Sequence, residues 1–140
     1  QLGNGTSGNG TESSTPVPVT TYGLPLSNVK DVALGMSHTC AVLNDNTVEC
    51  WGYNWDGQLG NGTSGNGTES STPVPVMTSE FAPLSSVKAI AAGGLHTCAV
   101  LNDNTVECWG YNWDGQLGNG TSGEGTASSY PVQVSMLGDL

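Results

Sequence analysis

Positive charge is nearly missing from this sequence, which has two lysines, Lys30 and Lys88, and no arginine among its 140 residues. Acidic residues number 12, and the formal net charge is -10. Proteins bind nucleic acid by replacing phosphate counterions with Lys and Arg, and anionic membrane surfaces attract basic segments in the same way. The composition therefore argues against a nucleic-acid partner and against an anionic membrane surface.

Long apolar runs and catalytic motifs are also missing. No stretch approaches roughly 18 consecutive apolar residues, so we expect no membrane insertion. The glycine-rich stretches precede neither a helical pattern nor a lysine, which argues against a phosphate-binding loop. We find no nucleophile–base pairing and no calcium-loop spacing, and we expect no enzyme activity, no cofactor and no metal site.

A verbatim repeat dominates what is present. The stretch HTCAVLNDNTVECWGYNWDGQLG occupies residues 38–60 and returns at 96–118, 58 residues later. Residues 1–19 are identical to residues 58–76. The chain thus holds about 2.4 units, and units of such repeat proteins bury their cores against their neighbours.

We divide the chain into a partial repeat at 1–19 (loop and outer strand), a first unit at 20–77 and a second unit at 78–140. It starts inside a repeated motif, without an initiator methionine or a signal peptide. We therefore expect a processed product or a window of a longer repeat chain.

Each unit has the pattern of short strands. Residues 29–34 alternate as a half-buried strand, and residues 38–43 and 47–53 form two more. Asn and Asp at 44–46 favour a tight turn, which predicts a hairpin between the last two strands. The prolines of residues 16–19 suit an edge strand. The pattern predicts an all-β fold whose units are blades of about four antiparallel strands.

The four cysteines fall into one pair per unit, Cys40 with Cys50 and Cys98 with Cys108. A hairpin turn centred on Asp45 places Cys40 directly opposite Cys50, close enough for a disulfide. Two buried free thiols are the alternative, and the spacing does not suit zinc. Disulfides point to an oxidising compartment, so we expect an extracellular or cell-surface location.

The order V-x-x-(I/V)-A-x-G-x-x-H-T-C-A-V-L-x-(D/N)-x-x-V-x-C-W-G-x-N-x-x-G-Q-L-G-x-G-T runs from Val29 and again from Val87. It resembles the regulator of chromosome condensation repeat over nearly the whole chain. The resemblance implies a β-propeller, usually seven-bladed, in which each repeat supplies the strands of a blade. The paired cysteines favour a secreted bacterial-type variant. A fold alone does not transfer a function.

His38 and His96 each stand without a carboxylate or cysteine at ligand spacing. The resemblance implies that this histidine is a structural core residue. Trp51 and Trp109 follow the second cysteine of each unit, and we expect them to pack between blades.

A second tryptophan of each unit lies in the loop after the last strand, beside an aspartate. These pairs are Trp55 with Asp56 and Trp113 with Asp114. Such a pair could pack between blades, or it could contact a ligand by stacking on a sugar ring.

Five Asn-Gly-Thr triplets fit the acceptor pattern for N-glycosylation. They begin at Asn4, Asn9, Asn61, Asn66 and Asn119. The Asn-Gly-Thr sequence also favours tight turns. It would then recur simply because the repeat was duplicated. In an extracellular chain, the crowding of Ser and Thr in the same loops favours glycosylation.

Two functions fit these patterns. The first is a non-enzymatic, extracellular structural repeat protein, glycosylated and assembled by packing on further copies of the same repeat into a fibre, sheath or adhesive surface layer. The alternative is a closed seven-bladed propeller that binds proteins or glycans. The identity of the copies favours the structural repeat protein, since a propeller that binds a specific partner usually has different loops in different blades.

Overall fold

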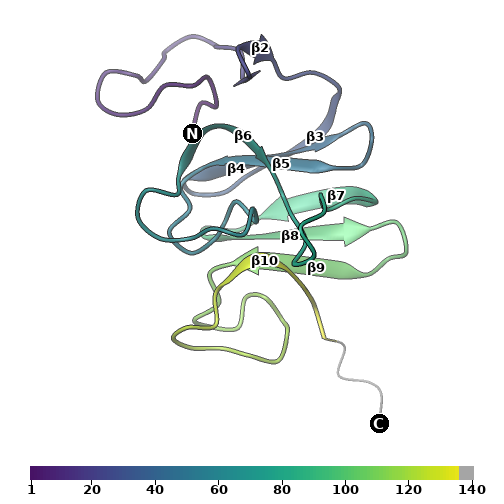
Figure 1. The fold of residues 1–140 in the computed structure, drawn as a ribbon. Helices are drawn as coiled ribbons and strands as arrows, with labels where there is room; N and C mark the ends of the chain where they lie inside the picture. The colour runs from purple at the N-terminus through teal and green to yellow at the C-terminus, as the bar shows by residue number, and fades with distance from the viewer. Residues whose placement is uncertain (136–140) are drawn as a thin grey trace.

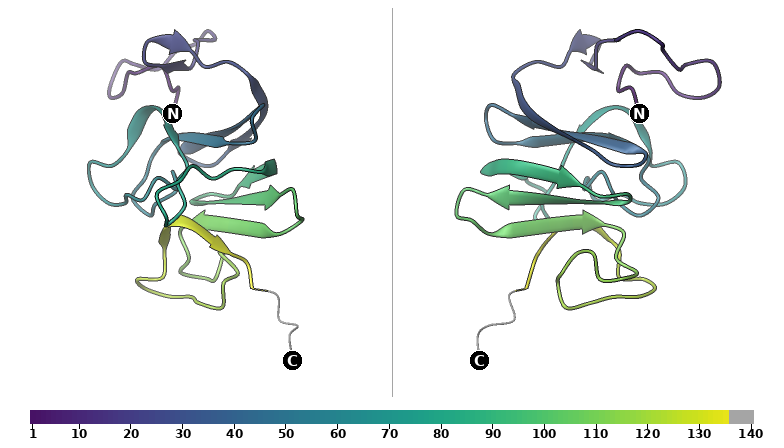
Figure 2. Two further views of the ribbon diagram at one scale, coloured as in Figure 1. Left: turned by 45° about the vertical axis from the view of Figure 1, so that its right-hand side comes forward. Right: turned by 180° about the vertical axis from the view of Figure 1, so that it is seen from behind.

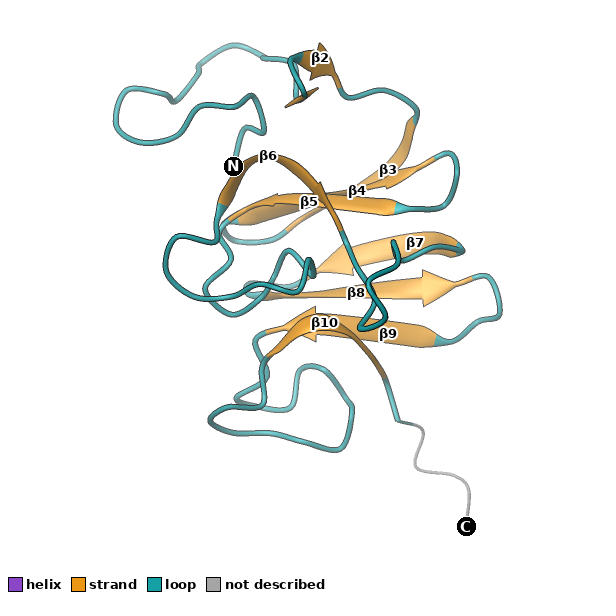
Figure 3. Ribbon diagram, viewed as in Figure 1, coloured by secondary structure: helices purple, strands orange, loops and turns teal. Residues whose placement is uncertain are grey.

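The computed structural model describes residues 1–135, so residues 136–140 of the second unit lie outside the described residues. Its strands are β1 (Thr20–Thr21), β2 (Leu24–Pro25), β3 (Val29–Leu34), β4 (His38–Leu43), β5 (Val48–Gly52), β6 (Ser70–Pro75), β7 (Val87–Ala92), β8 (His96–Leu101), β9 (Val106–Gly110) and β10 (Ser128–Gln133). Loops join these strands, and the described chain contains no helix (Figure 3). It therefore has no helix that could span a membrane.

Two four-stranded antiparallel sheets form the body of the molecule. Strands β3-β4-β5-β6 make the first blade and β7-β8-β9-β10 the second, each in sequence order. Strands β3 and β7 lie side by side, so the blades stack on each other (Figure 1). The predicted all-β class, with blades of about four antiparallel strands, is confirmed.

The hairpin between β4 and β5 has the predicted register. Cys40 pairs with Cys50. Asn46 takes a left-handed φ of 67°, and Asp45 Oδ1 accepts hydrogen bonds from the backbone N–H and the hydroxyl of Thr47, at 3.0 and 2.6 Å. These short polar side chains close the turn locally, which explains why sequence alone could place it. The second blade repeats the arrangement around Asp103.

Two local predictions are wrong. Residues 16–19 form no strand, whereas Ser70–Pro75, which contains the copy of the same prolines, is the edge strand β6 and pairs with β5. Among the described residues, no three-stranded sheet precedes residues 16–19 to pair with them. Strand β3 was expected to be half-buried, but Val32 is 55% and Leu34 71% exposed, because no blade covers that side.

The main core lies between the blades. The side of the first blade that contacts the second blade is called its back face, and the side of the second blade that contacts the first is called its front face. The same two names are used for the corresponding sides of both blades. The back face contributes Cys40, Val42, Val48 and Cys50, and the front face Val87, Ile90, Ala99 and Trp109. Burial therefore depends on a neighbouring blade rather than on one sheet alone.

Three glycine-rich loops gather on one side of the stack, opposite the hairpin turns that follow β4 and β8 (Figures 1 and 2). They are residues 1–19, 53–69 and 111–127. This side presents nearly the same loop sequence at successive units, with Asn66 and Glu69 of the first replaced by Glu124 and Ala127 in the second.

Candidate functional site

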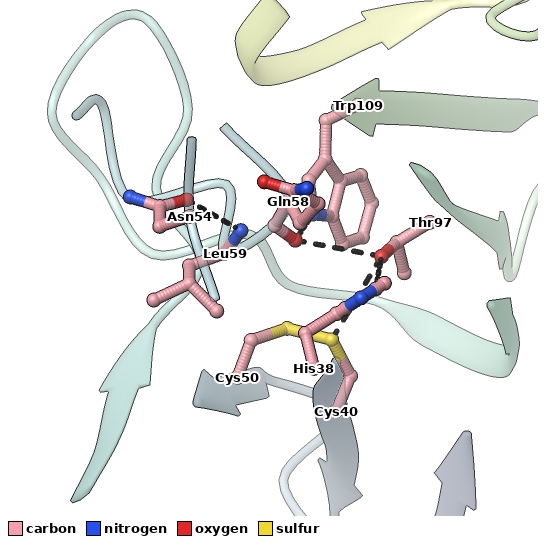
Figure 4. The surroundings of a disulfide bond; sticks show 8 residues. All are labelled: His38, Cys40, Cys50, Asn54, Gln58, Leu59, Thr97 and Trp109. Carbon is pink, nitrogen blue, oxygen red and sulfur yellow. Dashed lines mark hydrogen bonds between the residues drawn. A yellow bond between two sulfur atoms is a disulfide. The ribbon is translucent and has the colours of Figure 1, made fainter. Parts of the chain in front are cut away.

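A chain of buried hydrogen bonds joins the two blades at the start of β4. His38 Nε2 lies 2.8 Å from Thr97 Oγ1 of β8. That hydroxyl donates to the backbone carbonyl of Gln58 at 3.4 Å, and Trp109 Nε1 donates to the same carbonyl at 2.9 Å (Figure 4). All four residues are buried. The arrangement fixes the loop of one blade against the strands of the next.

His38 is held as a neutral imidazole. Burial lowers its pKa to about 4, helped by the charge that His96 would carry. Its Nδ1 atom is buried and has no hydrogen-bond partner among the described residues. His96 is half-buried, and burial lowers its pKa as well. The difference in exposure arises because only His38 faces a second blade.

Both predicted disulfides are present. Cys40 pairs with Cys50 and Cys98 with Cys108, each with Cα atoms 4.1 Å apart, so the alternative of free thiols is wrong. The Cys40–Cys50 bridge is fully buried in the blade junction (Figure 4). Cys98 is half-buried on the outer side of the second blade.

Trp51 and Trp109 are 4% and 0% exposed. Trp51 Nε1 donates to the carbonyl of Gln1 at 2.8 Å, as Trp109 does to Gln58. The partial repeat therefore docks on the first blade as the first blade's loop docks on the second. Gly60, with a φ of 65°, allows this contact, because a Cβ there would lie 2.7 Å from Trp109 Nε1.

Sequence reasoning missed the buried asparagine that organises each loop. Asn54 Oδ1 accepts from the N–H of Leu59 at 2.9 Å, while its Nδ2 contacts both the carbonyl and the hydroxyl of Thr63 and of Thr68 at 3.0–3.3 Å. Asn112 repeats these contacts in the second loop. The only signal was the recurrence of this residue in the C-W-G-x-N motif.

The loop tryptophans are exposed. Trp55 is 55% and Trp113 53% exposed. Trp55 stays exposed although the second blade is packed against the first. Packing between these two blades is therefore not the role of Trp55. Burial raises the pKa of Asp56, whose backbone N–H donates to Gln58 Oε1 at 3.0 Å. Asp114 makes the matching contact with its own loop.

The predicted glycosylation acceptors differ in their surroundings. Three of them accept both the backbone N–H and the hydroxyl of the threonine two residues later, at 2.6–3.2 Å, which is turn chemistry. They are Asn4, Asn61 and Asn119. The side chains of Asn9 and Asn66 are exposed at loop tips. Occupancy by a glycan stays a prediction.

The junction residues are buried and hydrogen-bonded to one another, so they hold the two blades together. Within residues 1–135, no group of three His, Cys, Asp or Glu side chains could hold a metal ion. Stacked four-stranded blades with this junction define a β-propeller-type repeat protein.

Comparison with known families agrees with this class. The regulator of chromosome condensation (RCC1) repeat matches residues 45–100, and a second model of the same repeat matches residues 29–58 and 87–116. Together the matches span more than half of the chain. The chain belongs to the RCC1 repeat family.

Several longer proteins are similar to it. The ultraviolet-B receptor UVR8 of Arabidopsis thaliana is 36% identical over 94% of this chain and 27% of its own length. Human WBSCR16 superimposes with a TM-score of 0.73 at 26% identity, over 96% of this chain and 33% of that one. Yeast RCC1 (Prp20), solved bound to Kap60, gives 0.66 at 25% identity, over 84% and 26%. The chain thus spans about a third or less of these relatives.

Proposed function

We propose that this chain is a non-enzymatic scaffold segment whose blades pack front to back on further copies of the same repeat. The observation that supports the proposal is that each open face carries copies of residues that are buried in the junction between the two blades. Val87 on the covered front face is fully buried, whereas its copy Val29 is 38% exposed. Cys40 on the covered back face is fully buried, whereas its copy Cys98 is half-buried.

The two open faces resemble the two sides of the junction that already exists inside the chain. The open back face repeats Cys40, Val42, Val48 and Cys50 as Cys98, Val100, Val106 and Cys108. The open front face repeats Val87 and Trp109 as Val29 and Trp51, with Val32 and Leu34 in place of Ile90 and Ala92. A heterologous contact of this kind repeats from unit to unit and gives a ring if the rotation closes or a filament if it does not. An extracellular fibre, sheath or adhesive layer remains our preferred form, and the two disulfides support an oxidising compartment.

One added repeat tests the docking. We expect that a copy of residues 78–135, appended in series, raises the free energy of unfolding and slows hydrogen exchange in β8. Val100, half-buried on the outer side of β8, would then lie in a new junction. Val100→Asp should abolish the gain in the extended chain and change the original chain little. An added unit that brings no stabilisation contradicts the proposal.

Electron microscopy of the native material separates the two assembled forms. Filaments would support the structural array, and discrete closed rings would support the alternative of a seven-bladed module that binds proteins or glycans. Intact mass before and after reduction and glycosidase treatment, measured on protein from its natural source, tests the extracellular assignment.

A further inference from the structure

The loop tryptophans are exposed, and hydrogen bonds fix the backbone on which they stand. The carbonyl of Trp55 accepts the N–H of Gly65 at 2.9 Å, and the carbonyl of Trp113 accepts that of Gly123 at 2.8 Å. Each loop is further fixed by its buried asparagine. An aromatic side chain on such a fixed backbone loses little conformational freedom when a ligand stacks on it.

A groove of about 190 Å³ lies beside Trp113, at the place where the loops of the two blades meet. Asp56 comes from the first blade, and every other lining residue comes from the second. The groove is lined by Asp56, Tyr111, Asn112, Trp113, Gly123, Glu124, Gly125 and Ala127. Two aromatic residues, Tyr111 and Trp113, and two acidic residues, Asp56 and Glu124, thus line one small hollow.

This combination suits a sugar ring. Aromatic faces offer a flat apolar surface for the C–H face of a pyranose, and carboxylates accept hydrogen bonds from hydroxyl groups. The net charge of -10 and the two carboxylates disfavour anionic sugars. We propose that the groove binds a neutral pyranose, with Trp113 stacking on the ring and Asp56 and Glu124 accepting hydrogen bonds from its hydroxyl groups.

The groove needs two consecutive units. The loop around Trp55 carries Asn66 and Glu69 where the second loop carries Glu124 and Ala127. No described residue supplies it with an aspartate from a preceding unit, since Asp56 is copied only at Asp114. Each further junction would add one groove, and a glycan with repeated sugars could then bind several grooves at once. The inference goes beyond the scaffold function and does not depend on it, because both walls come from one chain.

Titration of the purified chain with neutral trisaccharides tests the proposal. The probes are β-linked trisaccharides of glucose, galactose and N-acetylglucosamine, followed by saturation-transfer NMR and calorimetry, with trilysine for comparison. We expect at least one trisaccharide to bind, and Trp113→Ala and Asp56→Asn each to weaken its binding at least tenfold. Both positions lie in surface loops, and unchanged circular dichroism would show that the variants fold.

Asp114→Asn is the matched control. Asp114 has the same backbone and side-chain contacts as Asp56, but it lines a different hollow without an aromatic residue. Its substitution should leave sugar binding unchanged. The proposal is overturned by the absence of binding for all three trisaccharides, by equal losses in the two aspartate variants, or by binding of trilysine alone.

Discussion

His38 Nε2 and Thr97 Oγ1 lie 2.8 Å apart across the blade junction, although both blades carry the same His-Thr pair. Thr97 is fully buried, whereas its copy Thr39 is half-buried. His38 is buried, whereas its copy His96 is half-buried. Identical residues therefore differ in role according to which side of their blade is covered, and substitutions at the copies provide internal controls.

Thr97→Val should lower the free energy of unfolding by about 1–3 kcal/mol, because it leaves His38 Nε2 and the Gln58 carbonyl without their shared hydroxyl. Urea denaturation followed by tryptophan fluorescence measures the change. Thr39→Val, the same substitution at the half-buried copy, should cost much less. Equal losses at the two positions would show that the junction hydroxyl has no special role.

Removal of the two disulfides should have unequal effects. Each disulfide closes a loop of the same length, with a sequence separation of 10. Restriction of the unfolded chain therefore contributes equally to the two, about 2–3 kcal/mol each. Cys40 and Cys50 are 0% exposed and lie in the core between the blades, whereas Cys98 is half-buried. Cys40→Ala with Cys50→Ala should therefore destabilise more than Cys98→Ala with Cys108→Ala. Thermal melting of the two double variants checks the order, which a reversed ranking would refute.

Asn54→Asp should open the loop of the first blade. The substitution replaces a donating amide by a carboxylate that faces the carbonyls of Thr63 and Thr68. We expect a loss of about 3 kcal/mol and faster proteolysis within residues 53–69. Asn66→Asp makes the same chemical change at an exposed position and should alter neither measurement. A loop that remains resistant to protease in Asn54→Asp would contradict the anchoring role.

Stability should fall in mild acid because of His38. Its pKa is about 4 in the folded chain and near 6.5 when unfolded, so the unfolded state takes up the proton first. The stabilising contribution is complete above about pH 6.5 and is lost as the pH falls toward about 4, with a slope of up to ~1.4 kcal/mol per pH unit. Urea denaturation at successive pH values measures it.

His38→Gln supplies the reference for this titration, since glutamine does not titrate. Burial raises the pKa of Glu49 and Glu107, but both remain in the variant and cancel in the difference between the two proteins. The difference in the free energy of unfolding should shrink as the pH falls from 7 to 5. A difference independent of pH would mean that His38 titrates alike in both states.

Local features of the fold were predictable from sequence. The strand predicted over residues 38–43 and the Asn-Asp-Asn turn placed β4 and its hairpin, and the hairpin register placed Cys40 opposite Cys50. These predictions succeeded because each depends on neighbours a few residues away. The strand predicted at 16–19 failed because a strand also needs a partner, and the sequence does not say whether one is present.

The candidate sites were less predictable. The recurrence of Asn54 in the repeat gave no sign that it is 1% exposed and holds a loop together. The sequence left open whether Trp55 packs between blades or contacts a ligand, and only the placed second blade shows that packing between these two blades does not account for it. The groove joins Asp56 to Trp113, residues that lie 57 positions apart in the sequence.

The sequence by itself determined the repeat, the strands of each blade, the hairpin turn and the disulfide pairs, because periodicity and turn chemistry act over short distances. The tertiary structure decided which copy of each residue is buried. Stacking covers the back of one blade and the front of the next, and so gives His38, Cys40 and Thr97 surroundings that their identical copies do not share.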